Sequence, residues 1–295
     1  MRIAIASVGW LPPQFDDDRR LAAALGELGA EATSHPWDEA AVDWSDYDLV
    51  VIRSTWDYTL RRDEFVAWAE SIGDRLENPP AVIRWNSDKT YLADLAAAGL
   101  PVVETEYVAP GQPAPAIDRE VVVKPAISAG GRDTGRFGPA TGAEGRHLIE
   151  AIGAGGGTAM VQPFVDSVDT VGETAVVMID GELSHVLRKG AVLRPDEVAP
   201  VRDDELGAAE TMYDPDLVKT SVAEPDQLEL ASAVVAEVGE RFGAVPLYAR
   251  VDMVRDAAGD PVLLELEAVE PNLYFAEADG ADRRLAAAIV SRATR

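Results

Sequence analysis

Short apolar runs alternate with helically spaced apolar positions along the first third of the chain. The segments Arg2–Val8 and Asp48–Arg53 are continuous apolar runs, which are typical of buried parallel strands. Between them, Asp17–Leu28 carries leucine and alanine at helical spacing and stops at Gly29. A second helix is expected at Arg62–Ser71. This pattern predicts an open parallel α/β unit.

The remaining pattern predicts a mixture of strands and helices with no repeats. In chain order we expect a strand at Ala81–Trp85, a helix at Ser87–Ala98, a strand at Glu120–Lys124, a helix at Glu144–Ile152, strands at Ala159–Gln162, Glu173–Ile179 and Leu183–Arg188, a helix at Pro225–Phe242, two strands within Leu247–Pro271 and a helix at Ala281–Arg295. Asp180-Gly181 is a strong hairpin signal.

The predicted hairpin at Leu247–Pro271 gathers carboxylates on one face. Side chains alternate along a strand, so Arg250 shares a face with Asp252. Glu265 shares a face with Glu267 in the same way. A hairpin centred on its turn places Asp252 opposite Glu265 and therefore places Arg250 opposite Glu267. The opposite faces are apolar, with Val251, Met253, Leu264 and Leu266.

Three crowded carboxylates repel one another unless a cation lies between them. Clustered hard oxygen ligands of this kind suit Mg²⁺ that holds a polyphosphate. The alternative is a solvated polar face in which Arg250 and Glu267 form a cross-strand ion pair.

A lysine followed by a glycine-rich loop predicts a phosphate site. Lys124 ends an apolar strand, and the loop from Ser128 contains Gly130 and Gly131. Phosphate recognition needs a positive charge and closely approaching backbone N–H groups, which glycines permit. The P-loop and GxGxxG patterns are absent. An ordinary hairpin loop beside a surface-reaching lysine is the alternative.

Lysine is scarce in this chain, which makes each one informative. The lysines are Lys89, Lys124, Lys189 and Lys219. Lys89 lies in the first turn of a predicted helix, where a positive charge is electrostatically unfavourable unless an anion is near. An ordinary surface role is equally compatible with Lys89 and with Lys189.

A nucleotide base could lie near the end of the strand at Ala159–Gln162. Gln162, Phe164 and Val165 offer an amide, an aromatic face and backbone groups, which a purine requires. Glu173 could bind a pair of ribose hydroxyls. A hinge between strands would need the same residue types.

Composition narrows the function classes. The net charge is −26, so nucleic acid and anionic membranes would be repelled. The excess of acid over lysine fits a high-salt cytoplasm, although a GC-rich genome would also disfavour lysine. The absence of cysteine excludes disulfides, a thiolate nucleophile and cysteine-ligated zinc. No signal peptide or membrane span is evident, which predicts a cytoplasmic protein.

Taken in order, these features resemble the ATP-grasp superfamily over about Ala81–Asn272. The resemblance implies an α/β (α+β) ATP-grasp fold with a Rossmann-like lobe in residues 1–85, a small subdomain with a glycine-rich lid in residues 86–160 and a C-terminal subdomain with the magnesium site in residues 161–295. It also implies ATP and two Mg²⁺ ions as cofactors, with Lys89 and Lys124 on the phosphates, Gln162 on adenine and Glu173 on ribose. The metal ligands would be Asp252, Glu265 and Glu267, the last standing where the family usually has Asn.

A finer resemblance is carried by three motifs. Arg53–Tyr58, Trp85–Leu92 and Ser184–Gly190 are similar to the branch that contains the D-cycloserine-forming O-ureido-D-serine cyclo-ligase, among the glutathione synthetase and ribosomal S6 modification types. Candidate substrate residues are Arg53, Thr55, Asp57 and Tyr58. Arg53 follows a parallel strand where such sheets bind ligands, and a salt bridge to Asp57 is the alternative.

The resemblance implies an ATP- and Mg²⁺-dependent carboxylate–amine ligase, or cyclo-ligase, that acts through an acyl phosphate on an amino-acid-like substrate. Arg250 and Lys189 are the candidate catalytic side chains, with Arg250 gripping the substrate carboxylate or the developing charge. A peptide or protein C-terminal ligase and a non-catalytic nucleotide sensor are the alternatives. A homodimer is left open.

Overall fold

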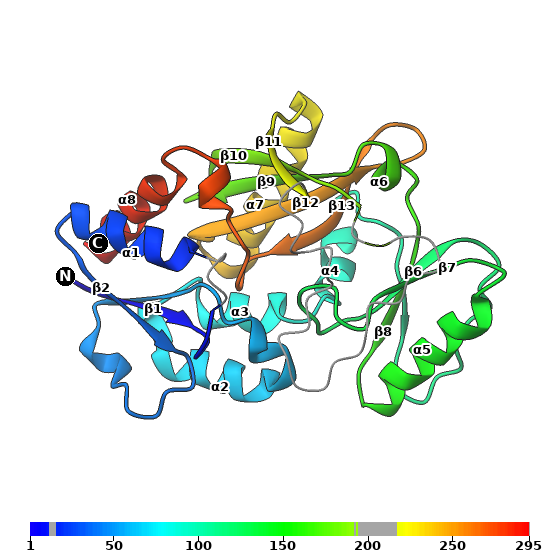
Figure 1. Ribbon diagram of the computed structural model, residues 1–295, viewed down its shortest axis with the longest axis horizontal. Coiled ribbons are helices and arrows are strands. Elements are labelled where there is room, and N and C mark those ends of the chain that lie inside the picture. Colours follow the sequence, from blue (N-terminus) through cyan, green and yellow to red (C-terminus); the bar gives the residue numbers. More distant parts are fainter. Residues whose placement is uncertain (12–15, 192, 194–216, 295) are drawn as a thin grey trace.

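The computed structural model describes residues 1–11, 16–191, 193 and 217–294, which form three sheets with helices against them (Figure 1). The first sheet is parallel, in the order β2-β1-β3-β4. Its strands are β1 (Arg2–Ser7), β2 (Glu31–Pro36), β3 (Leu49–Ile52) and β4 (Leu76–Glu77). The α-helices of this part are α1 (Asp17–Glu27), α2 (Arg62–Ile72) and α3 (Pro80–Asn86). Three short 3-10 helices, η1 (Trp44–Asp46), η2 (Trp56–Leu60) and η3 (Gly73–Arg75), complete it. The predicted parallel α/β unit is therefore present.

A second, antiparallel sheet lies at the opposite end of the molecule (Figure 1). It has the order β5-β8-β6-β7 and consists of β5 (Glu106–Val108), β8 (Ala159–Pro163), β6 (Val121–Pro125) and β7 (Gly135–Phe137). Helix α5 (Gly142–Ala154) packs on it through a small apolar core. The expected domain boundary between residues 160 and 161 falls inside β8, and the three domain ranges stay predictions.

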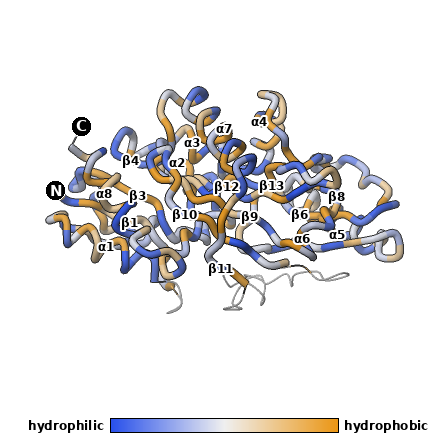
Figure 2. Tube along the Cα trace, turned by 90° about the horizontal axis from the view of Figure 1, so that it is seen from above, coloured by the Kyte–Doolittle hydropathy of each residue, from blue (hydrophilic) through white to orange (hydrophobic). Residues whose placement is uncertain are grey.

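The middle sheet carries the candidate chemistry. It is antiparallel in the order β11-β10-β9-β12-β13, with β11 (Val218–Ser221), β10 (Glu182–Lys189), β9 (Glu173–Ile179), β12 (Tyr248–Arg255) and β13 (Pro261–Glu267). Helices α4 (Tyr91–Ala97) and α7 (Pro225–Phe242) share an apolar core with one face, while α1 and α8 (Ala281–Ala293) share one with the other. The short α6 (Ser167–Thr170) and η5 (Phe275–Glu277) complete the elements. Hydrophobic segments run through this middle region (Figure 2).

The register of the β12–β13 hairpin agrees with the prediction. Asp252 pairs with Glu265, and Arg250 pairs with Glu267. The register then shifts, so that Met253 pairs with Leu263. This irregularity moves Leu264, expected on the apolar face, onto the wall of a cavity. The predicted alternation therefore holds only on one side of the shift.

Two predictions around residue 85 were wrong. Ala81–Trp85 is not a strand but the body of α3, because Pro80 at the first turn presets a helical φ. Val82 and Ile83 of this helix are buried in two different apolar cores. The next helix begins only at Tyr91, so Lys89 lies in the turn between the helices. The backbone N–H of Lys89 there donates to the carbonyl of Ala126 at 2.8 Å.

Within the described residues, no helix is both long and apolar enough to cross a bilayer.

Candidate active site

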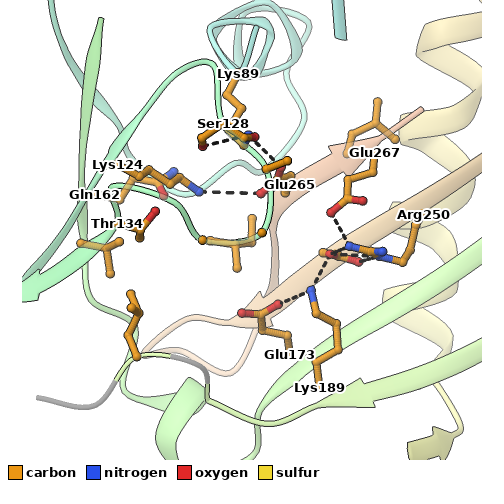
Figure 3. A pocket seen from close by; sticks show the side chains of 18 of the residues that line it. Lys89, Lys124, Ser128, Thr134, Gln162, Glu173, Lys189, Arg250, Glu265 and Glu267 are labelled. Carbon is orange, nitrogen blue, oxygen red and sulfur yellow. Dashed lines mark hydrogen bonds and ion pairs between the residues drawn. The ribbon is translucent and has the colours of Figure 1, made fainter. Parts of the chain in front are cut away.

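A cavity of about 310 Å³ lies where the middle sheet faces the β5–β8 sheet (Figure 3). Its wall contains most of the side chains that the sequence predicts for the site. These are Tyr58, Lys89, Lys124, Ser128, Gly130, Gly131, Gln162, Phe164, Val165, Glu173, Lys189, Arg250, Asp252, Glu265 and Glu267. The fold thus brings together residues more than 200 positions apart in sequence, while the role of each stays a prediction.

Two lysines converge on Glu265 at one side of the cavity. The Nζ of Lys89 lies 3.3 Å from one carboxylate oxygen, and the Nζ of Lys124 lies 3.9 Å from the other. Lys89 also donates to the carbonyl of Ser128 at 2.5 Å. Burial lowers the pKa of Lys124, although Glu265 opposes this. Burial acts against ionisation of Glu265, but the two lysines outweigh it and lower its pKa.

A second cluster surrounds Asp252. Lys189 places its Nζ 2.7 Å from Asp252 and 2.8 Å from Glu173. Arg250 donates to both oxygens of Asp252 at 2.9 Å. Burial opposes ionisation of Asp252, yet Arg250 and Lys189 hold its pKa well below the usual range. The same contacts raise the pKa of Lys189 and of Arg250 despite their burial. At neutral pH Asp252, Lys189 and Arg250 are therefore all charged.

Glu267 forms the cross-strand ion pair with Arg250 that the alternative interpretation of the hairpin predicts. Burial, together with repulsion from Asp252 and Glu265, nevertheless raises the pKa of Glu267 to about 7. The ion pair with Arg250 therefore only partly offsets the cost of burying the ionised Glu267 carboxylate.

The predicted metal ligands are held by basic side chains in this structure. Within the described part of the chain, no group of three or more His, Cys, Asp or Glu side chains is arranged to hold a metal ion. Asp252, Glu265 and Glu267 nonetheless all face one cavity, and hard carboxylate oxygens suit Mg²⁺. The donor set fits the ion, provided that some of the basic side chains turn towards an added anion.

The glycine loop has the backbone that its sequence predicts. Gly130 and Gly131 have φ of +64° and +74°, a region that favours glycine. At the base of the loop, Arg136 stacks its guanidinium over the ring of Phe164, 3.3 Å from the centroid. Gln162 donates to the hydroxyl of Thr105 at 2.9 Å.

Of the candidate substrate residues, only Tyr58 lines the cavity. Arg53 is buried and donates to the carbonyl of Pro271 at 2.6 Å, with its guanidinium over the Tyr248 ring. Thr55 is fully buried as well. Asp57 lies elsewhere, accepting from the Trp37 indole at 2.9 Å and pairing with Arg61 at 3.1 Å. These three side chains do not line the cavity, and their contacts with a substrate stay predictions.

Other cavity residues were missed by sequence reasoning. They include Trp56, Asn86, Glu270, Asn272 and Tyr274. A signal existed for three of them, because Glu270, Asn272 and Tyr274 are polar residues directly after the carboxylate strand. Asn86 carried no such signal, since its amide bonds Leu266 and Ala268 and so fixes β13 from another part of the chain.

The segment that follows β13, Val269–Leu273, is held by side chains along its whole length. All five of its backbone carbonyls accept a hydrogen bond from a side chain. The donors, in the order of the carbonyls, are Tyr248 at 2.9 Å, Trp56 at 3.2 Å, Arg53 at 2.6 Å, Arg250 at 2.9 Å and His185 at 2.8 Å. Burial lowers the pKa of His185 to about 4, so its ring is neutral at pH 7. The first parallel unit and the middle sheet therefore position this segment together.

Comparison with known proteins gives the family. Residues 3–78 match the model of the N-terminal domain of D-cycloserine synthetase DcsG. The cycloserine biosynthesis protein DcsG of Streptomyces lavendulae is 37% identical over 298 residues, covering 96% of this chain and 95% of that protein. This chain belongs to the DcsG family. A crystal structure of D-cycloserine synthetase DcsG matches it with a TM-score of 0.88 and 33% identity, covering 99% of this chain and 100% of the other.

More distant structures share the fold of the DcsG family. An ATP-grasp RimK domain protein from Sphaerobacter thermophilus has a TM-score of 0.65 at 18% identity, covering 98% of this chain and all of its own. A D-alanine–D-alanine ligase from Bacillus anthracis, solved with ATP, also has a TM-score of 0.65, at 14% identity, with coverage of 100% and 98%. The predicted ATP-grasp fold is therefore confirmed. As a DcsG-family member, this chain is an ATP-dependent ligase that forms a C–N bond.

Proposed function

We propose that this chain uses ATP to activate the carboxylate of an amino-acid-like substrate and then joins that carbon to a nitrogen of the same molecule. The observation that carries the proposal is the convergence of Lys89, Lys124, Lys189 and Arg250 with acidic side chains on one cavity. Ring closure is favoured over ligation of two molecules because the similarity to DcsG extends over nearly the whole chain.

The reaction has two steps. A substrate carboxylate oxygen attacks the γ-phosphorus, an O–P bond forms and ADP leaves. The nitrogen then attacks the acyl carbon, phosphate leaves and the nitrogen loses a proton. Such transfers depend mainly on positioning and charge stabilisation, so no protein nucleophile is needed.

Each basic group has a place in this scheme. Lys89 and Lys124 exchange their contacts with Glu265 for the phosphates of the nucleotide, and the glycine loop offers backbone N–H groups. When bound, Mg²⁺ supplies charge neutralisation of the triphosphate. Asp252, Glu265 and Glu267 would hold it, and two ions are proposed from the family resemblance. Arg250 holds the carboxylate that becomes the acyl phosphate, and Lys189 offsets the charge beside it.

The direct test is ADP release by the purified protein with ATP, Mg²⁺ and O-ureido-D-serine. We expect one ADP and one phosphate for each ring closed, with the cyclic product identified by mass spectrometry. A panel of small amino acids, each with and without a second amine, serves as the comparison. If no compound in either set releases ADP, the proposal is wrong; ADP release that requires a second amine would indicate an intermolecular ligase.

A further inference from the structure

The acidic side chains around the cavity differ in how they are compensated. Glu173, Asp252, Glu265 and Glu267 each contact a lysine or an arginine. Glu270 also lines the cavity, and within the described residues no other residue gives its carboxylate a hydrogen bond or an ion pair. The hydrogen bond that it does receive comes from its own backbone N–H.

The position of Glu270 is fixed by the fold. It belongs to Val269–Leu273, where every backbone carbonyl is held by a side-chain donor, and Trp56 bonds the carbonyl of Glu270 itself. Side chains from β12, β10 and the segment after β3 thus keep the backbone of this residue in place. A side chain at a cavity wall whose backbone is held in this manner binds a ligand at a lower ordering cost.

The kind of group that could contact the Glu270 carboxylate follows from the other charged groups in the cavity. A half-buried carboxylate is stabilised by a cation. The cationic side chains of the cavity already contact other carboxylates, or the phosphates in the proposed complex. ATP is an anion and cannot compensate Glu270. The proposed Mg²⁺ ligands are on the strands of the hairpin, whereas Glu270 lies beyond the end of β13. The remaining cation is one carried by the substrate.

We therefore propose that Glu270 binds the protonated amino group of the amino-acid-like substrate and selects for substrates that have one. This inference rests on the proposed function, which supplies an amino-acid-like substrate. Arg250 and Glu270 would then hold the two charged ends of the amino acid, one from the sheet face and one from the segment behind it. Asn272 and Tyr274 also line the cavity.

The test compares binding of two ligands to three proteins by calorimetry in the presence of Mg²⁺ and a non-hydrolysable ATP analogue. The ligands are O-ureido-D-serine and the same molecule with hydrogen in place of its α-amino group. The proteins are the wild type, Glu270→Gln and the control Glu277→Gln, which removes the same charge from an exposed position nearby. Glu270→Asp keeps the charge on a shorter side chain and serves if the first variant does not fold.

We expect the wild type and the control to bind the amino ligand more tightly than the deamino ligand, by roughly 10- to 150-fold for a charge-assisted hydrogen bond. Glu270→Gln should bind both about equally, with unchanged affinity for the ATP analogue, and Glu270→Asp should discriminate only partly. Undiminished discrimination in Glu270→Gln or Glu270→Asp would overturn the inference. ADP release by the wild type tests the proposed function independently of these binding measurements. A wild type that discriminates through Glu270 but releases no ADP contradicts only the proposed function.

Discussion

The Nζ of Lys189 lies 2.7 Å from Oδ2 of Asp252 in the wall of the cavity. Arg250 holds the same carboxylate, so a predicted metal ligand is already paired with two buried cations. Bringing Mg²⁺ to Asp252 therefore requires negative charge to arrive with it, which the triphosphate provides. In the proposed complex, the site would therefore bind a polyanion together with metal rather than a free metal ion.

Replacing Asp252 with Asn tests this arrangement. We expect turnover to fall below detection, because a ligand oxygen with its charge is lost. We also expect the free energy of unfolding to fall by about 3–5 kcal/mol, since Lys189 and Arg250 lose the buried partner they share. The measurements are ADP release and urea denaturation. Asp226→Asn removes a partly exposed ion pair with Arg255 and should change neither greatly. Normal turnover in Asp252→Asn would contradict the metal assignment.

The glycine loop offers a matched pair of substitutions. Gly131 and Gly156 both have positive φ, at +74° and +83°, but only Gly131 lines the cavity. Changing either to Ala should cost about 1–2 kcal/mol of unfolding free energy, because a Cβ is unfavourable there. Gly131→Ala should additionally raise the KM for ATP, by roughly tenfold for a displaced backbone donor. Equal KM values in the two variants would show that the loop does not contact the nucleotide.

Arg53 is expected to act on the substrate through the segment Val269–Leu273. Arg53→Lys cannot reproduce the geometry of the guanidinium bond to Pro271. We predict a higher KM for the amino-acid substrate, roughly five- to tenfold for one net hydrogen bond, with the KM for ATP within about twofold of wild type. Arg61→Lys, on the same stretch but half-exposed, is the control. A proportional rise in both KM values would instead indicate general unfolding of the site.

The elements that the sequence predicted well are those with one dominant local signal. The helix at Pro225–Phe242 has a proline at its first turn, an apolar stripe and a terminal glycine, and it matches α7. The hairpin register followed from alternation and a single turn. By contrast, β2 and β5 were not predicted, because Glu31–Pro36 and Glu106–Val108 are polar or short and become strands only by pairing with β1 and β8.

The site residues that could be predicted are likewise those with a clear local signal. Charged residues such as Lys124 and Asp252 could be found because their chemistry is unusual for their local pattern. Arg53 looked equally informative, yet its target is a carbonyl 218 positions away in sequence, which no local pattern encodes. Glu270 was overlooked although it follows the carboxylate strand, because one glutamate among 52 acidic residues is a weak signal. It stands out only when the described residues are seen to give its carboxylate no ion pair.

The acidic composition predicts a response to salt. With a net charge of −26, self-repulsion opposes the compact state and is screened by added ions. We expect the midpoint of thermal unfolding to rise between low and molar KCl, and to rise less with sucrose at equal osmolality, because sucrose does not screen charge. A falling midpoint in KCl would contradict the high-salt interpretation.

Glu270 also predicts a pH dependence of stability in the absence of ligands. Burial, followed by repulsion from Glu267, raises the pKa of Glu270 from its ordinary 4.5 to about 8 in the folded protein. The folded state therefore holds this proton more tightly than the unfolded state does. The resulting stabilisation is complete below pH 4.5 and disappears as the pH rises through 8. Above that pH, the wild type carries a half-buried charge that Lys89 offsets only in part.

Glu270→Gln removes this titration and leaves a neutral side chain of the same size. Relative to wild type, the variant should gain stability steadily from pH 5 to pH 9, reaching at most about 5 kcal/mol because each pKa unit corresponds to about 1.4 kcal/mol and partial exposure reduces the effect. Urea denaturation without Mg²⁺ or nucleotide measures the difference, and Glu277→Gln should show almost none. A gain at pH 9 together with lost selection for the amino group would mean that the enzyme keeps an unfavourable charge at this position because its substrate compensates it. A difference between Glu270→Gln and wild type that does not vary with pH would show that Glu270 keeps an ordinary pKa.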